Sequence, residues 1–140
     1  MKRICVVDGQ GGGIGATLIK CIKEAYGESV ELIGLGTNAI ASAQMLKAGA
    51  NRCASGENAI VQTVRSADLV AGPISITWPN AMLGEVTPKM AEAIMTSPVT
   101  KVLLPLTQEP VALVGFEREP LPHLVQRAVK EKIQEVLGDV

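Results

Sequence analysis

Short apolar runs alternate with segments of helical periodicity along the whole chain. The first run, at residues 4–7, is uninterrupted, which is typical of a strand buried on both faces of a sheet. After it, Ile14, Leu18 and Ile22 recur at the spacing of one helix face. This alternation predicts parallel strands joined by helices. Strands are expected at 4–7, 30–35, 51–54, 68–71, 101–104 and 111–114, and helices at 14–26, 38–48, from about 57, 88–97 and 122–137.

These elements predict one α/β domain that covers residues 1–140. We expect three layers, with helices on both faces of a mostly parallel, doubly wound sheet in the order 3-2-1-4-5 and a last strand that is antiparallel or at an edge. Thr87 and Pro88 have the residue types of an N-cap and a first helical position. Residues 74–86 fit no regular pattern, and we interpret them as an extended segment or a lid.

A glycine cluster follows the first predicted strand in the string VVDGQGGGIGATLIK. Five of the fourteen glycines of the chain lie between residues 9 and 15. Glycine permits positive φ and lets the backbone approach a ligand, and the next helix start offers free N–H groups that favour a phosphate. Gly11, Gly13 and Ala16 fit the GxGxxA form of the dinucleotide motif. The alternative is a tight crossover that needs glycine only for packing.

The same string resembles the cofactor loop of the short-chain dehydrogenases, whose pattern is TGxxxGIG. The resemblance covers about the first 26 residues and implies a pyrophosphate laid across Gly9, Gly13 and Gly15. Asp8 stands where the family has threonine, and no acidic residue closes the second strand. The family's catalytic YxxxK is absent, because Tyr26 is the only tyrosine and no lysine lies four residues after it.

We therefore predict a Rossmann-like domain that binds a phosphorylated nucleotide, with NAD or NADP as the cofactor. A weak echo, GTNAI and GENAI, places Asn38 and Asn58 at two helix starts on one edge of the sheet. No Arg or Lys lies beside Asn38, which speaks against a 2′-phosphate. The predicted binding residues are Gly9, Gln10, Gly11, Gly12, Gly13, Ile14, Gly15, Thr37, Asn38, Asn58, Gly72 and Pro73.

Two carboxylates belong to the same predicted edge. Asp8 is interpreted as a loop brace that accepts backbone N–H bonds, with an acid/base group or a magnesium ligand as the alternatives. Glu85 is interpreted as a solvated residue or a charge at a helix start. Trp78 has two open interpretations, stacking on a ligand ring and burial in a subunit interface.

Composition excludes several classes of protein. Thirteen basic and fourteen acidic residues leave a net charge of −1, and aromatic residues make up 2%, so we expect no nucleic-acid partner. Three scattered cysteines and one histidine predict neither a disulfide framework nor a metal site. The first apolar run ends at Asp8, so we expect no signal peptide, no membrane partner and a cytoplasmic location. A charged fraction of 19% and mean hydropathy of +0.28 predict a homo-oligomer.

Over most of its length the chain resembles a small bacterial family known only as a domain of unknown function. The stretches GLGTNAIASAQMLKAGANRCASGENAI and MLGEVTPKMAEAI carry this resemblance. It implies the fold and size and no activity. Three functions stay open: a nucleotide-binding module without a complete catalytic set, a small oxidoreductase that completes its site at an oligomer interface, and an accessory protein with a structural glycine loop.

Overall fold

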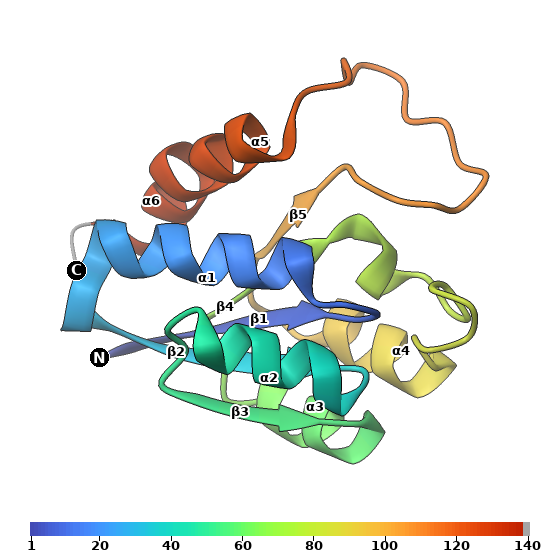
Figure 1. Ribbon diagram of the computed structural model, residues 1–140, viewed down its shortest axis with the longest axis horizontal. Coiled ribbons are helices and arrows are strands. Elements are labelled where there is room, and N and C mark those ends of the chain that lie inside the picture. The colour runs from blue at the N-terminus through green and yellow to red at the C-terminus, as the bar shows by residue number, and fades with distance from the viewer. Residues whose placement is uncertain (139–140) are drawn as a thin grey trace.

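The computed structural model describes residues 1–138 and places five parallel strands in one sheet between two layers of helices (Figure 1). The strand order is β3-β2-β1-β4-β5, which confirms the predicted order and the three-layer α/β fold. The strands are β1 (Lys2–Asp8), β2 (Val30–Gly36), β3 (Arg52–Ser55), β4 (Leu69–Pro73) and β5 (Lys101–Leu104).

Burial explains why the central strands are apolar and uninterrupted. β1 lies between β2 and β4, so both of its faces are covered, and its side chains divide between two cores. Ile4 and Val6 face one helical layer, whereas Cys5 and Val7 face the other. β3 is an edge strand, and its four residues are half-buried or exposed.

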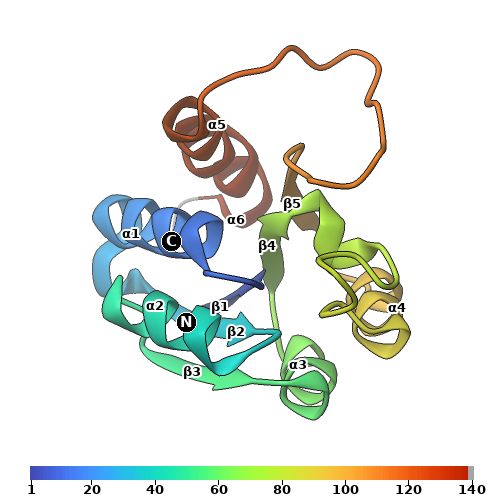
Figure 2. The ribbon, with the colours of Figure 1, turned by 45° about the vertical axis from the view of Figure 1, so that its right-hand side comes forward.

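The helices divide between the two faces as a doubly wound sheet requires (Figure 2). One layer holds the helices that follow β1, β2 and β5, and the other holds those that follow β3 and β4. The first layer comprises α1 (Gly13–Tyr26), α2 (Ala39–Lys47), α5 (Leu121–Arg127), the π-helical turn η3 (Ala128–Ile133) and α6 (Gln134–Leu137). The second comprises α3 (Glu57–Val64) and α4 (Pro88–Thr96).

The predicted caps agree with the structure at two helix starts. The Asn38 side chain accepts a hydrogen bond from the N–H of Ala41 at the start of α2. The Thr87 hydroxyl accepts one from the N–H of Met90, with Pro88 in the first turn of α4. Both helices therefore begin where the sequence predicts, because capping depends on neighbouring residues only.

The strand predicted at 111–114 is wrong, and so is the extended one of the two interpretations of residues 74–86. Residues 111–114 form no strand; they lie in an irregular arm, residues 105–120, that arches away between β5 and α5 (Figure 1). β5 pairs only with β4, and Val114 of the arm is 95% exposed, so its apolar run has no ladder partner. Residues 74–86 are not extended either: the 3-10 helix η2 (Ile74–Thr77) precedes a series of turns with positive φ at Asn80, Met82, Leu83 and Gly84.

Candidate functional site

The glycine loop, residues 9–13, joins the end of β1 to the start of α1, and its glycines serve different purposes. Gly12 has a φ of 75°, and a Cβ there would lie 2.8 Å from the Ala41 Cα, so this position requires glycine. A Cβ at Gly11 or Gly13 would meet nothing within 4 Å. The backbone at these two positions is therefore open to a ligand.

Asp8 braces the glycine loop from below. Its side chain is 4% exposed, and its two oxygens accept the N–H groups of Gly9 at 2.8 Å and Gly15 at 2.7 Å. This geometry confirms the interpretation as a loop brace. Burial raises the pKa of Asp8 above its ordinary value, although the backbone hydrogen bonds oppose that rise.

An open cavity of about 360 Å³ lies above the glycine loop, where the chain leaves β1 and β4 toward opposite faces of the sheet. Ligands of doubly wound folds bind at this switch point. We call this cavity the open side. Its lining comprises Asp8, Gly9, Gln10, Gly11, Gly12, Gly13, Ile14, Pro73, Ser75, Met82, Leu106, Thr107, Gln108, Glu109 and Arg118.

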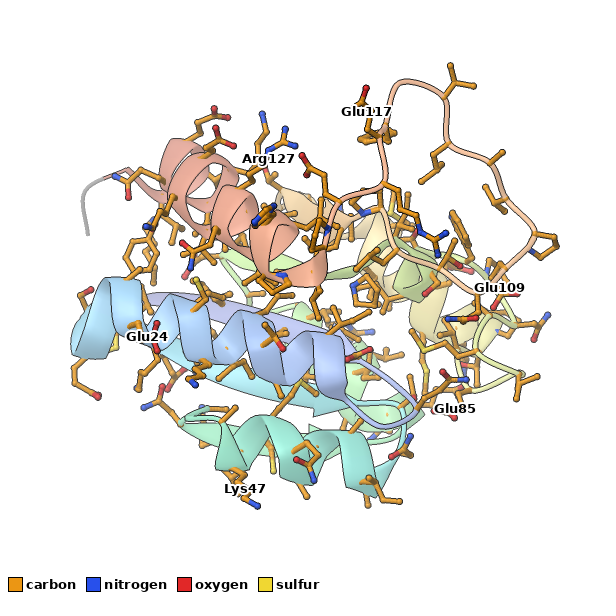
Figure 3. All side chains as sticks on the ribbon, turned by 45° about the horizontal axis from the view of Figure 1, so that its top comes forward. Glu24, Lys47, Glu85, Glu109, Glu117 and Arg127 are labelled. Carbon is orange, nitrogen blue, oxygen red and sulfur yellow. The ribbon has the colours of Figure 1, made fainter. Side chains whose placement is uncertain are left out.

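The neighbouring end of β2 is closed by Glu85, which comes from the lid, residues 78–86. The Thr37 hydroxyl lies 2.6 Å from Glu85 Oε1, and the Asn38 Nδ2 lies 2.8 Å from the same oxygen. The N–H of Gln10 donates to it as well, at 2.8 Å. Figure 3 shows Glu85 beside the turn between β1 and α1. We call this group of four residues the closed side.

Glu85 is therefore not the solvated or helix-start charge that the sequence suggested. Its side chain is half-buried, and one oxygen accepts three hydrogen bonds. Partial burial raises the pKa of Glu85, but the hydrogen bonds from Thr37, Gln10 and Asn38 outweigh it and hold the pKa below its ordinary value. The carboxylate is stabilised in its charged form.

The structure brings together most of the predicted binding residues, and it places others elsewhere. Residues 9–14 and Pro73 line the open side. Thr37 and Asn38 adjoin the loop but donate to Glu85 on the closed side. Asn58 is exposed in the first turn of α3 and lies outside the cavity lining.

Two predicted glycines lie behind the cavity. The N–H of Gly15 is engaged by Asp8, and a Cβ at Gly15 would press on the Met45 side chain. A Cβ at Gly72 would clash with the backbone oxygen of Val7 in the neighbouring strand. Both glycines allow close packing beneath the site.

Some cavity residues come from distant loops and were not among the predicted binding residues. Arg118 reaches the open side from the arm, and Ser75 reaches it from η2. Glu109, also in the arm, accepts the N–H of Met82 at 2.9 Å and so ties the arm to the lid. No local motif marks these positions. Trp78 is partly buried against the core on the face of the sheet that α3 and α4 cover, and it is not part of the lining.

The rest of the described chain offers no rival site with comparable chemistry. A cavity of about 430 Å³ is lined by side chains of α3 and α4 and of the residues that follow them, and its lining contains no glycine. Among residues 1–138, no three His, Cys, Asp or Glu side chains gather in a way that could hold a metal ion. No helix in the same range is long and apolar enough to span a bilayer.

Comparisons with known proteins give a family and distant structural likenesses. No curated protein matches the chain. Among solved structures, a dodecameric FMN-dependent UbiX-like decarboxylase from Escherichia coli O157:H7 has 14% sequence identity and a TM-score of 0.47, over 99% of this chain and 95% of that one. The profile of one family matches residues 3–137. The chain thus belongs to the family described as a domain of unknown function, DUF3842.

Proposed function

We propose that the chain binds a phosphorylated nucleotide, with a phosphate held against the glycine loop on the open side. The observation that carries this proposal is the cavity itself, whose floor is exposed glycine backbone at the start of a fourteen-residue helix. The helix start contributes N–H groups and a partial positive charge, both of which favour a phosphate. NAD(P) and flavin mononucleotide both belong to this ligand class.

One cationic side chain at the rim of the cavity supports an anionic ligand. Asp8 and Glu109 also line it, but each carboxyl group already accepts backbone N–H bonds. Arg118 is exposed at the rim and makes no ion pair within residues 1–138. Its guanidinium is therefore free to bind a phosphate oxygen.

A thermal-shift panel followed by calorimetry tests the proposal. The panel holds NAD, NADP, FMN, FAD, nicotinamide mononucleotide, AMP and ATP, with and without magnesium. A ligand at about 100 times its Kd adds about 2.7 kcal/mol to the free energy of unfolding. We expect at least one nucleotide to raise Tm by several degrees.

Gly13→Leu is the matched site variant. A Cβ at Gly13 would meet nothing within 4 Å, so the unliganded Tm should stay near the wild-type value. The substitution should nevertheless abolish the ligand-induced shift. Lys20→Leu, on an exposed position of the same helix, is the control that should keep it. Failure of every nucleotide to bind the wild type, or undiminished binding by Gly13→Leu, would overturn the proposal.

We also propose that the chain assembles with copies of itself and works in the cytoplasm. The exposed apolar side chains of the arm support assembly, since Val114 is 95% and Phe116 is 63% exposed. The free thiols of Cys5, Cys21 and Cys53 support a reducing compartment. Size-exclusion chromatography with light scattering should show a dimer or larger species, and a monomer at all concentrations would contradict the assembly.

A further inference from the structure

The end of β2 decides how far a ligand can extend from the glycine loop. In dinucleotide-binding sheets, an acidic residue there holds the ribose of the adenosine half. In this chain a carboxylate is present at that place, but it comes from the lid, 48 residues beyond Thr37. Glu85 accepts hydrogen bonds from the groups that would otherwise face a ribose.

The glycine loop and the lid are in close contact at the closed side. A Cβ built on Gly9 would lie 2.5 Å from Thr37 Oγ1, 2.6 Å from Met82 Sδ and 3.2 Å from Glu85 Oε1. A methyl group at this position would require the Thr37 and Met82 side chains to move. At Gly11 and Gly13, on the open side, the same test finds nothing within 4 Å.

The polar groups of Asn38 and the backbone of Gln10 on the closed side are also hydrogen-bonded. Asn38 donates to Glu85 and to the backbone oxygen of Gln10, while its own oxygen caps α2. Gln10 is held at a φ of 49° with both its N–H and its carbonyl engaged. A ligand that crossed the end of β2 would have to displace Glu85 and break the hydrogen bonds that it accepts. These bonds are stronger than bonds between neutral groups, because the acceptor is a charged carboxylate.

We propose that the ligand of this site is a mononucleotide and that Glu85 excludes dinucleotides. The inference rests on the proposed function. The single phosphate lies on the glycine loop, and the nucleoside extends over Pro73 toward residues 106–109 of the arm, where the cavity is open. Glu85 acts as a specificity-determining residue that touches no part of the bound mononucleotide.

Matched ligand pairs test the inference by calorimetry. FMN is compared with FAD, and nicotinamide mononucleotide with NAD, because each dinucleotide contains its mononucleotide plus an adenylate. For the pair that binds, we expect the wild type to favour the mononucleotide by more than about tenfold, since several charge-assisted hydrogen bonds oppose the adenylate. Glu85→Ala should reduce this preference to less than about threefold by tightening dinucleotide binding, because those hydrogen bonds are gone.

Three further variants act as controls. Glu85→Gln keeps an oxygen acceptor of the same shape but removes the charge, so it should keep only part of the preference. Glu92→Ala removes an exposed carboxylate on α4 and should change neither affinity. Should Glu85→Ala fail to fold, Thr37→Val removes one of the three donors while keeping a branched side chain, and the preference should then fall in part.

The outcomes separate the two proposals. A wild-type protein that binds the dinucleotide as tightly as its mononucleotide overturns the inference and leaves nucleotide binding intact. A preference that Glu85→Ala and Thr37→Val leave unchanged overturns the role of Glu85. Absence of binding by every compound overturns nucleotide binding and the inference together.

Discussion

The two sides of the glycine loop lie at one edge of one sheet, yet only one of them is open. On the closed side, Glu85 of the lid bonds to Gln10, Thr37 and Asn38. On the open side, residues 106–109 and Arg118 of the arm line a cavity of about 360 Å³, while the middle of the arm arches away (Figure 1). A polar edge is therefore not in itself a binding site; the long connections decide which part of it stays accessible.

The difference follows from the donors that each side offers the lid. Thr37 and Asn38 follow β2 with a hydroxyl and an amide, both of which donate to Glu85. Pro73 ends β4 and has no backbone N–H to offer. The lid begins after β4 and crosses β1 toward β2, where Glu85 finds these two donors and the N–H of Gln10.

Gly72→Ala should have the largest effect on stability, because it disturbs the packing of β4 against β1 beneath the two sides. Its Cβ would clash with the Val7 backbone oxygen inside the sheet, where neither strand can move away freely. We expect a loss of about 2–3 kcal/mol in the free energy of unfolding. Urea denaturation measures it, with Gly11→Ala as the control at an open position. Equal stability of the two variants would contradict close packing at Gly72.

Asp8→Asn should weaken the brace that both sides share. Asparagine has one oxygen, so its amide would face one of the two N–H donors now bound by Asp8. We expect a loss of about 1–2 kcal/mol at neutral pH, seen as a lower Tm.

The pH dependence of that loss has a definite sign. The folded pKa of Asp8 lies above the ordinary value of 3.8, so its contribution to stability is complete below pH 3.8 and is lost as the pH rises through the folded pKa. The difference between wild type and Asp8→Asn should therefore shrink from acid to neutral pH. A difference that grows over this range would contradict the raised pKa.

Acid should open the closed side and leave the sheet intact. The folded pKa of Glu85 lies below the ordinary value of 4.5, so its stabilising contribution is complete above pH 4.5 and is lost as the pH falls through the folded pKa. The effect is on the order of 1 kcal/mol. NMR of the Gln10 amide should show a titration with its midpoint below 4.5, and Glu85→Gln should abolish it. A midpoint above 4.5 would contradict the hydrogen-bonded closure.

Asn58→Ala should have the smallest effect, because this residue belongs to neither side. Its side chain is exposed on α3 and does not line the cavity. We expect a change of less than about 0.5 kcal/mol in stability and no change in nucleotide affinity. Calorimetry with the best ligand of the panel measures it, and a clear loss of affinity would place the ligand beyond the end of β2.

Most of the fold could be predicted from the sequence, because burial leaves a local pattern. Uninterrupted apolar runs mark β1 and β4, and capping residues mark the starts of α2 and α4. The predicted strand at 111–114 failed for a non-local reason. Its composition suits a strand, but Val111 and Val114 find no neighbour with which to pair.

The candidate site was predictable only where one segment supplies it. By itself, the sequence determined the layered α/β architecture and the glycine loop with its brace at Asp8, because periodicity, turns and caps depend on residues close along the chain. Only the tertiary structure decided that Glu85 closes the end of β2 and that Arg118 reaches the cavity. The contacts of Glu85 join loops 47 or more residues apart, and their geometry exists only once the sheet has brought the loops to one edge.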